Sequence, residues 1–128
     1  MNSPVKFLRG HYDINGDDFF FRSKWEANYA LYLNFLIKQG QIKSWEYEPQ
    51  IFYFLKIKRG TRSYTPDFKV WVSGAIYEWH EVKGYMDAAS NTKLKRMALY
   101  YPAEHIKLIQ RPLYNEILKK LRGIINFY

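Results

Sequence analysis

Two acidic residues and a lysine lie on adjacent stretches that we expect to pair as the strands of a β-hairpin. Residues 64–72 and 76–83 both alternate in character, as strands with two different faces do. Ser73-Gly74-Ala75 between them is predicted to form a three-residue loop, because its glycine can take a positive φ. If the two residues that flank this loop pair with each other, Asp67 falls directly opposite Glu81.

A pair of carboxylates in these positions points to metal chemistry. Residues paired across an antiparallel ladder have Cβ atoms about 5 Å apart, and like charges at that separation are destabilising. A divalent cation is the obvious way to offset the repulsion, and carboxylate oxygens are the hard ligands that suit Mg²⁺ or Mn²⁺. Lys83 shares the face of Glu81. Its ammonium can position a water or stabilise the negative charge that develops on a phosphoryl group.

These residues resemble the signature of the PD-(D/E)XK nuclease superfamily, in which a Pro-Asp pair precedes a Glu-x-Lys triplet. In this chain the pair is Pro66-Asp67 and the triplet is Glu81-Val82-Lys83. The separation between the two acids, Asp67 and Glu81, is ordinary for the superfamily. The resemblance extends from residue 22 to residue 101 and is closest to small phage-type endonucleases. It is carried by Arg22-Ser23-Lys24-x-Glu26-Ala27, Trp45-x-x-Glu48-Pro49, Pro66-Asp67-Phe68, Glu81-Val82-Lys83-Gly84, Lys93-Leu94-Lys95-Arg96 and Tyr101-Pro102.

The resemblance implies a role for each residue of the site. Asp67, Glu81 and the backbone carbonyl of Val82 would bind Mg²⁺, and Lys83 would orient the attacking hydroxide. An acidic residue of the first helix often points at the metal in this superfamily, and Glu26 stands at the matching place. Glu26 also completes a Ser-x-x-Glu capping box, so a helix-capping role stays open beside the catalytic one.

The surrounding periodicity predicts an α/β protein with the order α-β-β-β-α-β-α and a central mixed sheet flanked by helices. This is also the restriction-endonuclease-like core that the resemblance implies. We expect an irregular N-terminal segment with a turn at Asn15-Gly16, and a connection over residues 42–48. Further elements are predicted as a helix over 24–39, a strand over 50–58, a helix from 88 or 92 to 100, a strand over 105–110 and a helix over 113–122.

Composition indicates a soluble protein that we expect to form one domain over residues 1–128. Of its 128 residues, 48% are hydrophobic and 25% charged, and no apolar run approaches the length of a membrane span. The N-terminus lacks the apolar core of a signal peptide, so we expect a cytoplasmic protein, in the host cytoplasm if a phage encodes it. Absence of cysteine excludes disulfides and thiol nucleophiles.

A formal net charge of +8 favours a polyanionic partner, and we expect that partner to be DNA. Solvated loop tips and helix faces are the commoner explanation for such charges. The predicted DNA-binding residues are Arg22, Lys24, Arg59, Arg62, Lys69, Lys93, Lys95 and Arg96.

These features together predict a Mg²⁺-dependent endonuclease that cuts branched DNA such as a Holliday junction, with Mn²⁺ as a possible substitute. One small domain has little room for a sequence-reading module, whereas a symmetric dimer can cut two strands of a junction. The apolar tail over residues 124–128 packs on its own core or forms a dimer contact. Alternatives are a less selective nicking or DNA-degrading phage nuclease, a non-catalytic nucleic-acid-binding module, and a basic structural protein.

Overall fold

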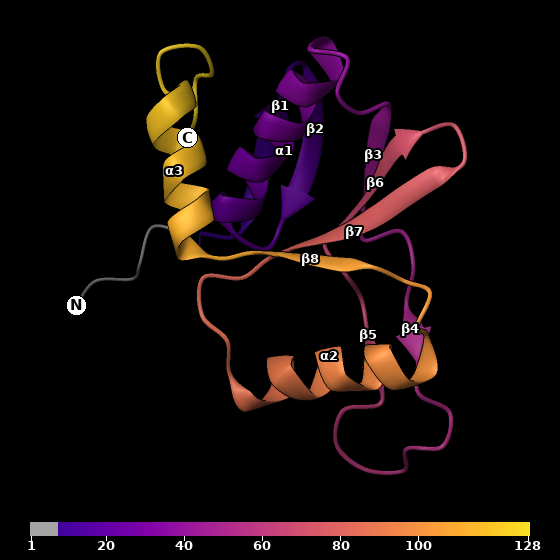
Figure 1. Ribbon diagram of the computed structural model, residues 1–128. Helices are drawn as coiled ribbons and strands as arrows, with labels where there is room; N and C mark the ends of the chain where they lie inside the picture. The colour runs from indigo at the N-terminus through magenta and orange to yellow at the C-terminus, as the bar shows by residue number, and fades with distance from the viewer. Residues whose placement is uncertain (1–7) are drawn as a thin grey trace, which may run out of the picture. The chain divides into compact units, whose positions relative to one another are not determined.

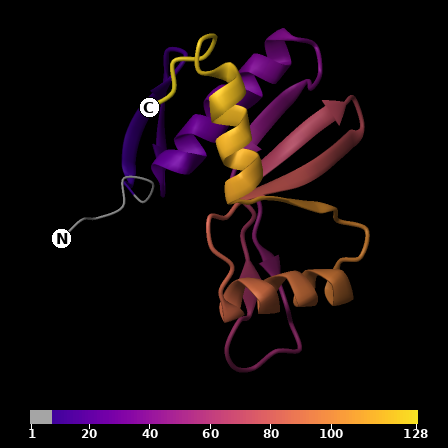
Figure 2. The same cartoon turned by 60° about the vertical axis from the view of Figure 1, so that its left-hand side comes forward.

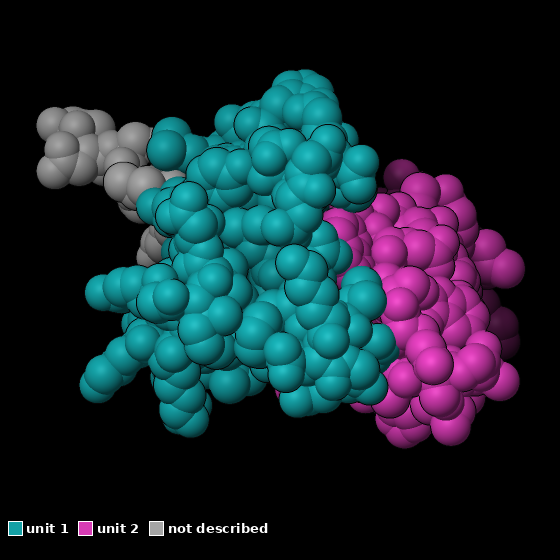
Figure 3. All heavy atoms as spheres, turned by 90° about the horizontal axis from the view of Figure 1, so that it is seen from above, with its two compact units in different colours: residues 1–42, 112–128 teal, residues 43–111 magenta. Residues whose placement is uncertain are grey.

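The computed structural model describes residues 8–128, which form a mixed α/β protein made of two compact units. One unit contains Pro112–Tyr128 and the described residues up to Ile42, and the other contains Lys43–Arg111 (Figure 3). Over the described residues the chain forms eight strands and three helices. No helix among them is long and apolar enough to cross a membrane.

The first unit begins with a hairpin that the sequence did not predict. Strands β1 (Gly10–Ile14) and β2 (Asp17–Phe21) pair antiparallel around Asn15-Gly16, whose φ values are 53° and 101°. Positive φ at both central residues is what a two-residue hairpin turn requires. The turn was therefore placed correctly, but the expectation of an irregular segment was wrong. Consecutive Phe19-Phe20-Phe21 obscures the alternation that would have revealed β2.

The two helices of this unit follow their predictions closely. Helix α1 (Lys24–Lys38) is capped by Ser23, whose side chain accepts a hydrogen bond from the backbone N–H of Glu26. Helix α3 (Arg111–Leu121) begins two residues before its predicted start. Trp25 of α1 stacks on Tyr114 of α3 with ring centroids 4.0 Å apart.

The second unit contains a four-stranded mixed sheet (Figures 1 and 2). Its strands lie in the order β3 (Ser44–Tyr47), β6 (Phe68–Ser73), β7 (Ile76–Val82) and β8 (Ile106–Ile109). Neighbouring strands are antiparallel except for β7 and β8, which are parallel. The prediction of a mixed central sheet is thus confirmed.

The edge strand of this sheet is not the one that the sequence predicted. Residues 42–48 were expected to be a connection, but β3 lies within them. The predicted strand over 50–58 is reduced to β4 (Phe52–Tyr53), which pairs with β5 (Ser63–Tyr64) in a separate two-stranded sheet. The strand conformation ends between β3 and β4, because Glu48 has a φ of 46° and is followed by Pro49. The apolar residues after Pro49 therefore cannot continue β3.

The turn of the β6–β7 hairpin also differs from its prediction. The prediction was a three-residue loop with Val72 paired to Ile76. In the structure Ser73 pairs with Ile76 instead, so the turn consists of Gly74 and Ala75. A bulge between Trp71 and Ser73 takes up the extra residue. The pairs beyond the bulge, such as Phe68 with His80, therefore keep the predicted register.

Helix α2 (Ala88–Tyr100) covers the core of the second unit through Met97. Met97 is the buried residue of this helix, whereas Leu94 is half-buried and Ala98 is exposed. The core cluster consists of Phe52, Phe54, Tyr64, Trp79 and Met97.

The buried His80 predicts a pH-dependent stability. Its Nε2 lies 2.8 Å from Glu78 Oε1, and burial lowers its pKa below the usual value although Glu78 opposes this. As the pH falls through about 6.5, His80 therefore becomes protonated in the unfolded chain while it is still neutral in the folded chain. The free energy of unfolding should fall as the pH drops below about 6.5.

Urea denaturation at several pH values checks this expectation. Replacing the buried histidine, in His80→Gln, should remove part of the pH-dependent loss of stability, whereas His105→Gln, at an exposed position, should not. Equal pH dependence in wild type and His80→Gln would show that the expectation is wrong.

Candidate functional site

Asp67 lies just before β6, and its backbone oxygen, its backbone N–H and its side chain each form a hydrogen bond. Its backbone oxygen accepts a hydrogen bond from Glu48 N at 2.7 Å, and its backbone N–H donates to Glu81 Oε1 at 3.2 Å. Its side-chain Oδ2 accepts a hydrogen bond from Val82 N at 2.8 Å. With Pro66 fully buried before it and only 6% of its own surface exposed, Asp67 has a fixed position at the sheet.

Glu81 is fixed by the same network from the facing strand. Its Oε1 accepts a second hydrogen bond, at 2.9 Å, from the hydroxyl of Tyr64. The sequence predicted two acids opposite each other with their repulsion offset by a cation. The structure places them at that level of the hairpin and also shows N–H and O–H donors, which offset part of the negative charge.

Tyr64 belongs to this site although no motif pointed to it. It is buried, and burial and then the charge of Glu81 raise its pKa well above the ordinary value. Its hydroxyl therefore stays protonated at neutral pH and donates to the carboxylate. The only signal in the sequence is its place two residues before Pro66, at the start of the first arm of the predicted hairpin.

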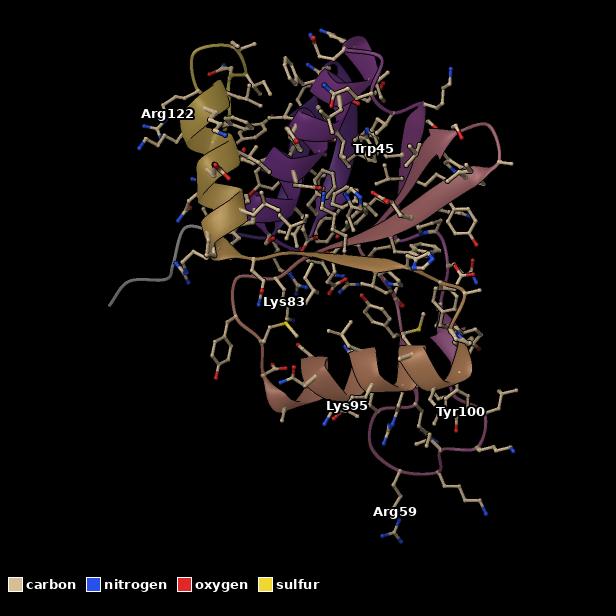
Figure 4. The ribbon with its side chains drawn as sticks, viewed as in Figure 1. Trp45, Arg59, Lys83, Lys95, Tyr100 and Arg122 are labelled. Atoms are coloured by element: carbon tan, nitrogen blue, oxygen red, sulfur yellow. The ribbon has the colours of Figure 1, made fainter. Side chains whose placement is uncertain are left out.

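Lys83 follows directly after β7 and lines a pocket with Glu81. Its backbone N–H donates to Ile109 O at 3.0 Å, which extends the contact between β7 and β8 by one residue. Figure 4 shows its side chain between the sheet and the first turns of α2. The pocket is lined by Tyr64, Glu81, Lys83, Met86, Ser90, Lys93, Leu94 and Leu108.

Two cations and a carboxylate thus share one concave surface. Lys93, predicted from the basic face of the second helix, lines the pocket with Lys83. Asp87 lies at the N-cap of α2, where its Oδ1 accepts a hydrogen bond from Ser90 N at 2.8 Å. Hydrogen bonds from Ser90 and the charge of Lys83 lower the pKa of Asp87.

The structure assigns Glu26 a local role. Its Oε1 accepts a hydrogen bond from Arg22 N at 3.3 Å, and its Oε2 accepts one from the hydroxyl of Ser23 at 3.1 Å. This is a variant of the predicted capping box, because the amide that it reaches belongs to Arg22 rather than to Ser23. Glu26 belongs to the first unit and the rest of the site to the second. Its role at a metal stays a prediction.

The predicted DNA-binding residues have diverse surroundings. Lys69 places its ammonium 4.5 Å from the ring centroid of Trp71 and 4.2 Å from that of Tyr77. The guanidinium of Arg96 donates a hydrogen bond to Thr61 O. The most accessible side chains of the set, as the structure shows them, are Arg22, Arg59, Arg62 and Lys95.

The donor atoms at the hairpin fit a hard divalent cation. Two carboxylates and the carbonyl of Val82 offer oxygen ligands of the kind that Mg²⁺ and Mn²⁺ prefer. Within residues 43–111, no third His, Cys, Asp or Glu joins these two acids in a group that could hold a metal.

Comparison with known proteins identifies a family. A family model described as a protein of unknown function (DUF1064) matches residues 10–116, which include every element from β1 into α3. No curated protein and no solved structure matches the chain significantly.

The hydroxyl of Tyr64 gives a prediction about stability. Tyr64→Phe keeps the ring and removes the donor to Glu81, and a hydrogen bond to a charged group contributes roughly 1.5–3 kcal/mol. We expect the free energy of unfolding in urea to fall by an amount in this range.

Tyr101→Phe is the matched control, because its hydroxyl donates to a backbone carbonyl, that of Tyr53, at an exposed position. Its loss should cost less, about 1 kcal/mol or under. Equal losses in the two variants would contradict a special role of the Tyr64 hydroxyl at Glu81.

Proposed function

The chain belongs to the DUF1064 family, described as proteins of unknown function, and we propose that it is a metal-dependent endodeoxyribonuclease acting on branched DNA such as Holliday junctions. In this proposal it works in the cytoplasm as a homodimer. Its site is formed by Asp67, Glu81 and Lys83, with Val82 contributing its carbonyl.

The observation that carries the proposal is the way in which Asp67 and Glu81 are held. Each carboxylate accepts a backbone N–H from the strand of the other, at 2.8 Å and 3.2 Å. Both acids are thereby fixed at one level of the hairpin, and Glu81 lines a pocket together with Lys83. Fixed oxygen donors next to an ammonium suit phosphodiester hydrolysis, because the groups need no rearrangement when charge develops.

The order of elements supports the same proposal. Helix α1 is followed by β3, β6 and β7, then by α2 and β8. Two antiparallel pairings and one parallel pairing join the four strands. This is the succession expected of a restriction-endonuclease-like core, with β4, β5 and the N-terminal hairpin as additions.

The residues of the site have separate tasks in this proposal. Asp67, Glu81 and the Val82 carbonyl would hold Mg²⁺. A bound Mg²⁺ supplies a water of lowered pKa and offsets the charge of the phosphate oxygens. Lys83 donates hydrogen bonds that orient the attacking water or stabilise the charge on the phosphoryl group.

The positive charge of the chain supports DNA as the partner. Exposed cations on the segment between β4 and β5 and on α2 can contact phosphates without reading base sequence. A branched substrate is favoured because the described elements include no helix-turn-helix or similar module that would read bases.

A non-catalytic DNA-binding module is the second candidate. It is favoured by the structural use of both acids, since each carboxylate already stabilises the hairpin through backbone donors. In that case the site needs neither a metal nor a free ammonium.

Cleavage of junction, flap and linear duplex DNA in Mg²⁺ or Mn²⁺ distinguishes the two candidates. We expect the wild type to cut branched DNA only with the metal, and Asp67→Asn and Lys83→Ala to lose cleavage while they retain DNA binding. These variants should lower the single-turnover rate at saturating protein by about two orders of magnitude or more.

Lys95→Ala is the matched control, because it removes an exposed lysine of α2 that does not line the pocket. It should weaken binding slightly and leave the saturated rate unchanged. Cleavage that does not depend on the metal, or no cleavage of DNA of any shape, would count against the nuclease. The non-catalytic binding module would then be the better candidate.

A further inference from the structure

The loop between β4 and β5 combines positive charge with an exposed leucine. We define the 55–62 loop by its residues, which run from Leu55 to Arg62. The side chain of Leu55 is 88% exposed, more than any other large hydrophobic side chain of the described residues. The segment from residue 51 to residue 66 contains no acidic residue. The exposed cations of the loop are Lys56, Lys58, Arg59 and Arg62.

Alternation along the chain places Leu55 on the surface. Phe52 and Phe54 point into the core, where Phe54 is 1% exposed and its ring lies 5.4 Å from that of Tyr100. Tyr53 and Leu55 consequently point outward. Burying a leucine side chain is favourable, and Leu55 forgoes this gain in the isolated chain. Another molecule that covers Leu55 would recover it.

The 55–62 loop is tied at its base rather than freely suspended. Phe54 N donates to Arg62 O at 2.8 Å, directly after the pairs that join β4 to β5. The guanidinium of Arg96 on α2 donates to Thr61 O. Figures 1 and 2 both show the loop extending beyond α2, and Figure 4 shows Arg59 at its outer end, pointing away from the helix.

We propose that the 55–62 loop is a DNA wedge, whose cations bind backbone phosphates while Leu55 inserts between bases at a branch point. Apolar side chains that enter a base step must unstack it, which costs free energy. That cost is least where stacking is already interrupted, as it is at a junction. Charge complementarity favours DNA as the occupant, because four cations and no acid follow the leucine within the loop.

This inference deepens the proposed function, because it assigns the preference for branched DNA to a segment outside the catalytic residues. It does not require cleavage. Binding can therefore be measured in EDTA, which removes the metal that cleavage needs. A failure of the loop to act on the branch point is then observed separately from a failure of the protein to cleave DNA.

The test uses a four-way junction that carries 2-aminopurine at the branch point and, in a second sample, within one arm. We expect binding of the full chain to raise the fluorescence at the branch point only, because an unstacked 2-aminopurine is brighter. Leu55→Ser should lose most of this rise. Leu99→Ser is the matched control, since Leu99 is 76% exposed on α2 outside the loop, and it should keep the rise.

The cations are tested by the salt dependence of binding. Replacing Lys58 and Arg59 with glutamine removes two phosphate contacts, so the slope of log affinity against log salt should decrease by about 2 in magnitude. Lys119→Gln with Lys120→Gln, two lysines of α3, should change it less.

Each outcome decides the proposal. No binding, binding without a rise at the branch point, or an unchanged rise in Leu55→Ser would overturn it. A change of oligomeric state in Leu55→Ser, measured by sedimentation, would also overturn it, since a second copy of the chain would then cover the leucine. A rise that depends on Leu55 in a protein that never cleaves DNA would support the wedge and refute the nuclease.

Discussion

The three hydrogen bonds that hold Asp67 are the constraint on which the site depends. Glu48 fixes its backbone oxygen from one side, Glu81 receives its N–H, and Val82 donates to its carboxylate. A strand that slips by one residue turns every side chain to the opposite face. Because these bonds join β7 and the segment after β3 to the same residue, they allow only one register, and with it one arrangement of Glu81 and Lys83.

The parts of the fold that could be predicted are those with a strong local pattern. Ser23 and a helical repeat of apolar residues predicted α1, and alternation on both arms predicted the β6–β7 register. The turn was wrong by one residue, and a bulge before Ser73 compensated for the error. The edge strand was missed because β3 has only four residues, although Trp45 and Tyr47 alternate with polar residues, and because the more apolar stretch after Pro49 resembles a longer strand.

The site shows the same division between local pattern and long-range contact. Asp67, Glu81 and Lys83 could be grouped from sequence because one hairpin carries them all. Tyr64 could not, since the partner of a tyrosine hydroxyl depends on how the preceding segment folds back. Lys69 was grouped with DNA-binding cations by its charge alone, and its packing over Trp71 and Tyr77 depends on cross-strand neighbours that a count of charges does not consider.

Structural and chemical use of the two acids are compatible, because the donors arranged around them favour negative charge. Backbone N–H groups and the hydroxyl of Tyr64 can only strengthen a carboxylate that stays ionised. Glu81 lines a pocket together with Lys83 and Lys93, so its charge is held by hydrogen-bond donors on one side and lies in a pocket with two ammonium groups.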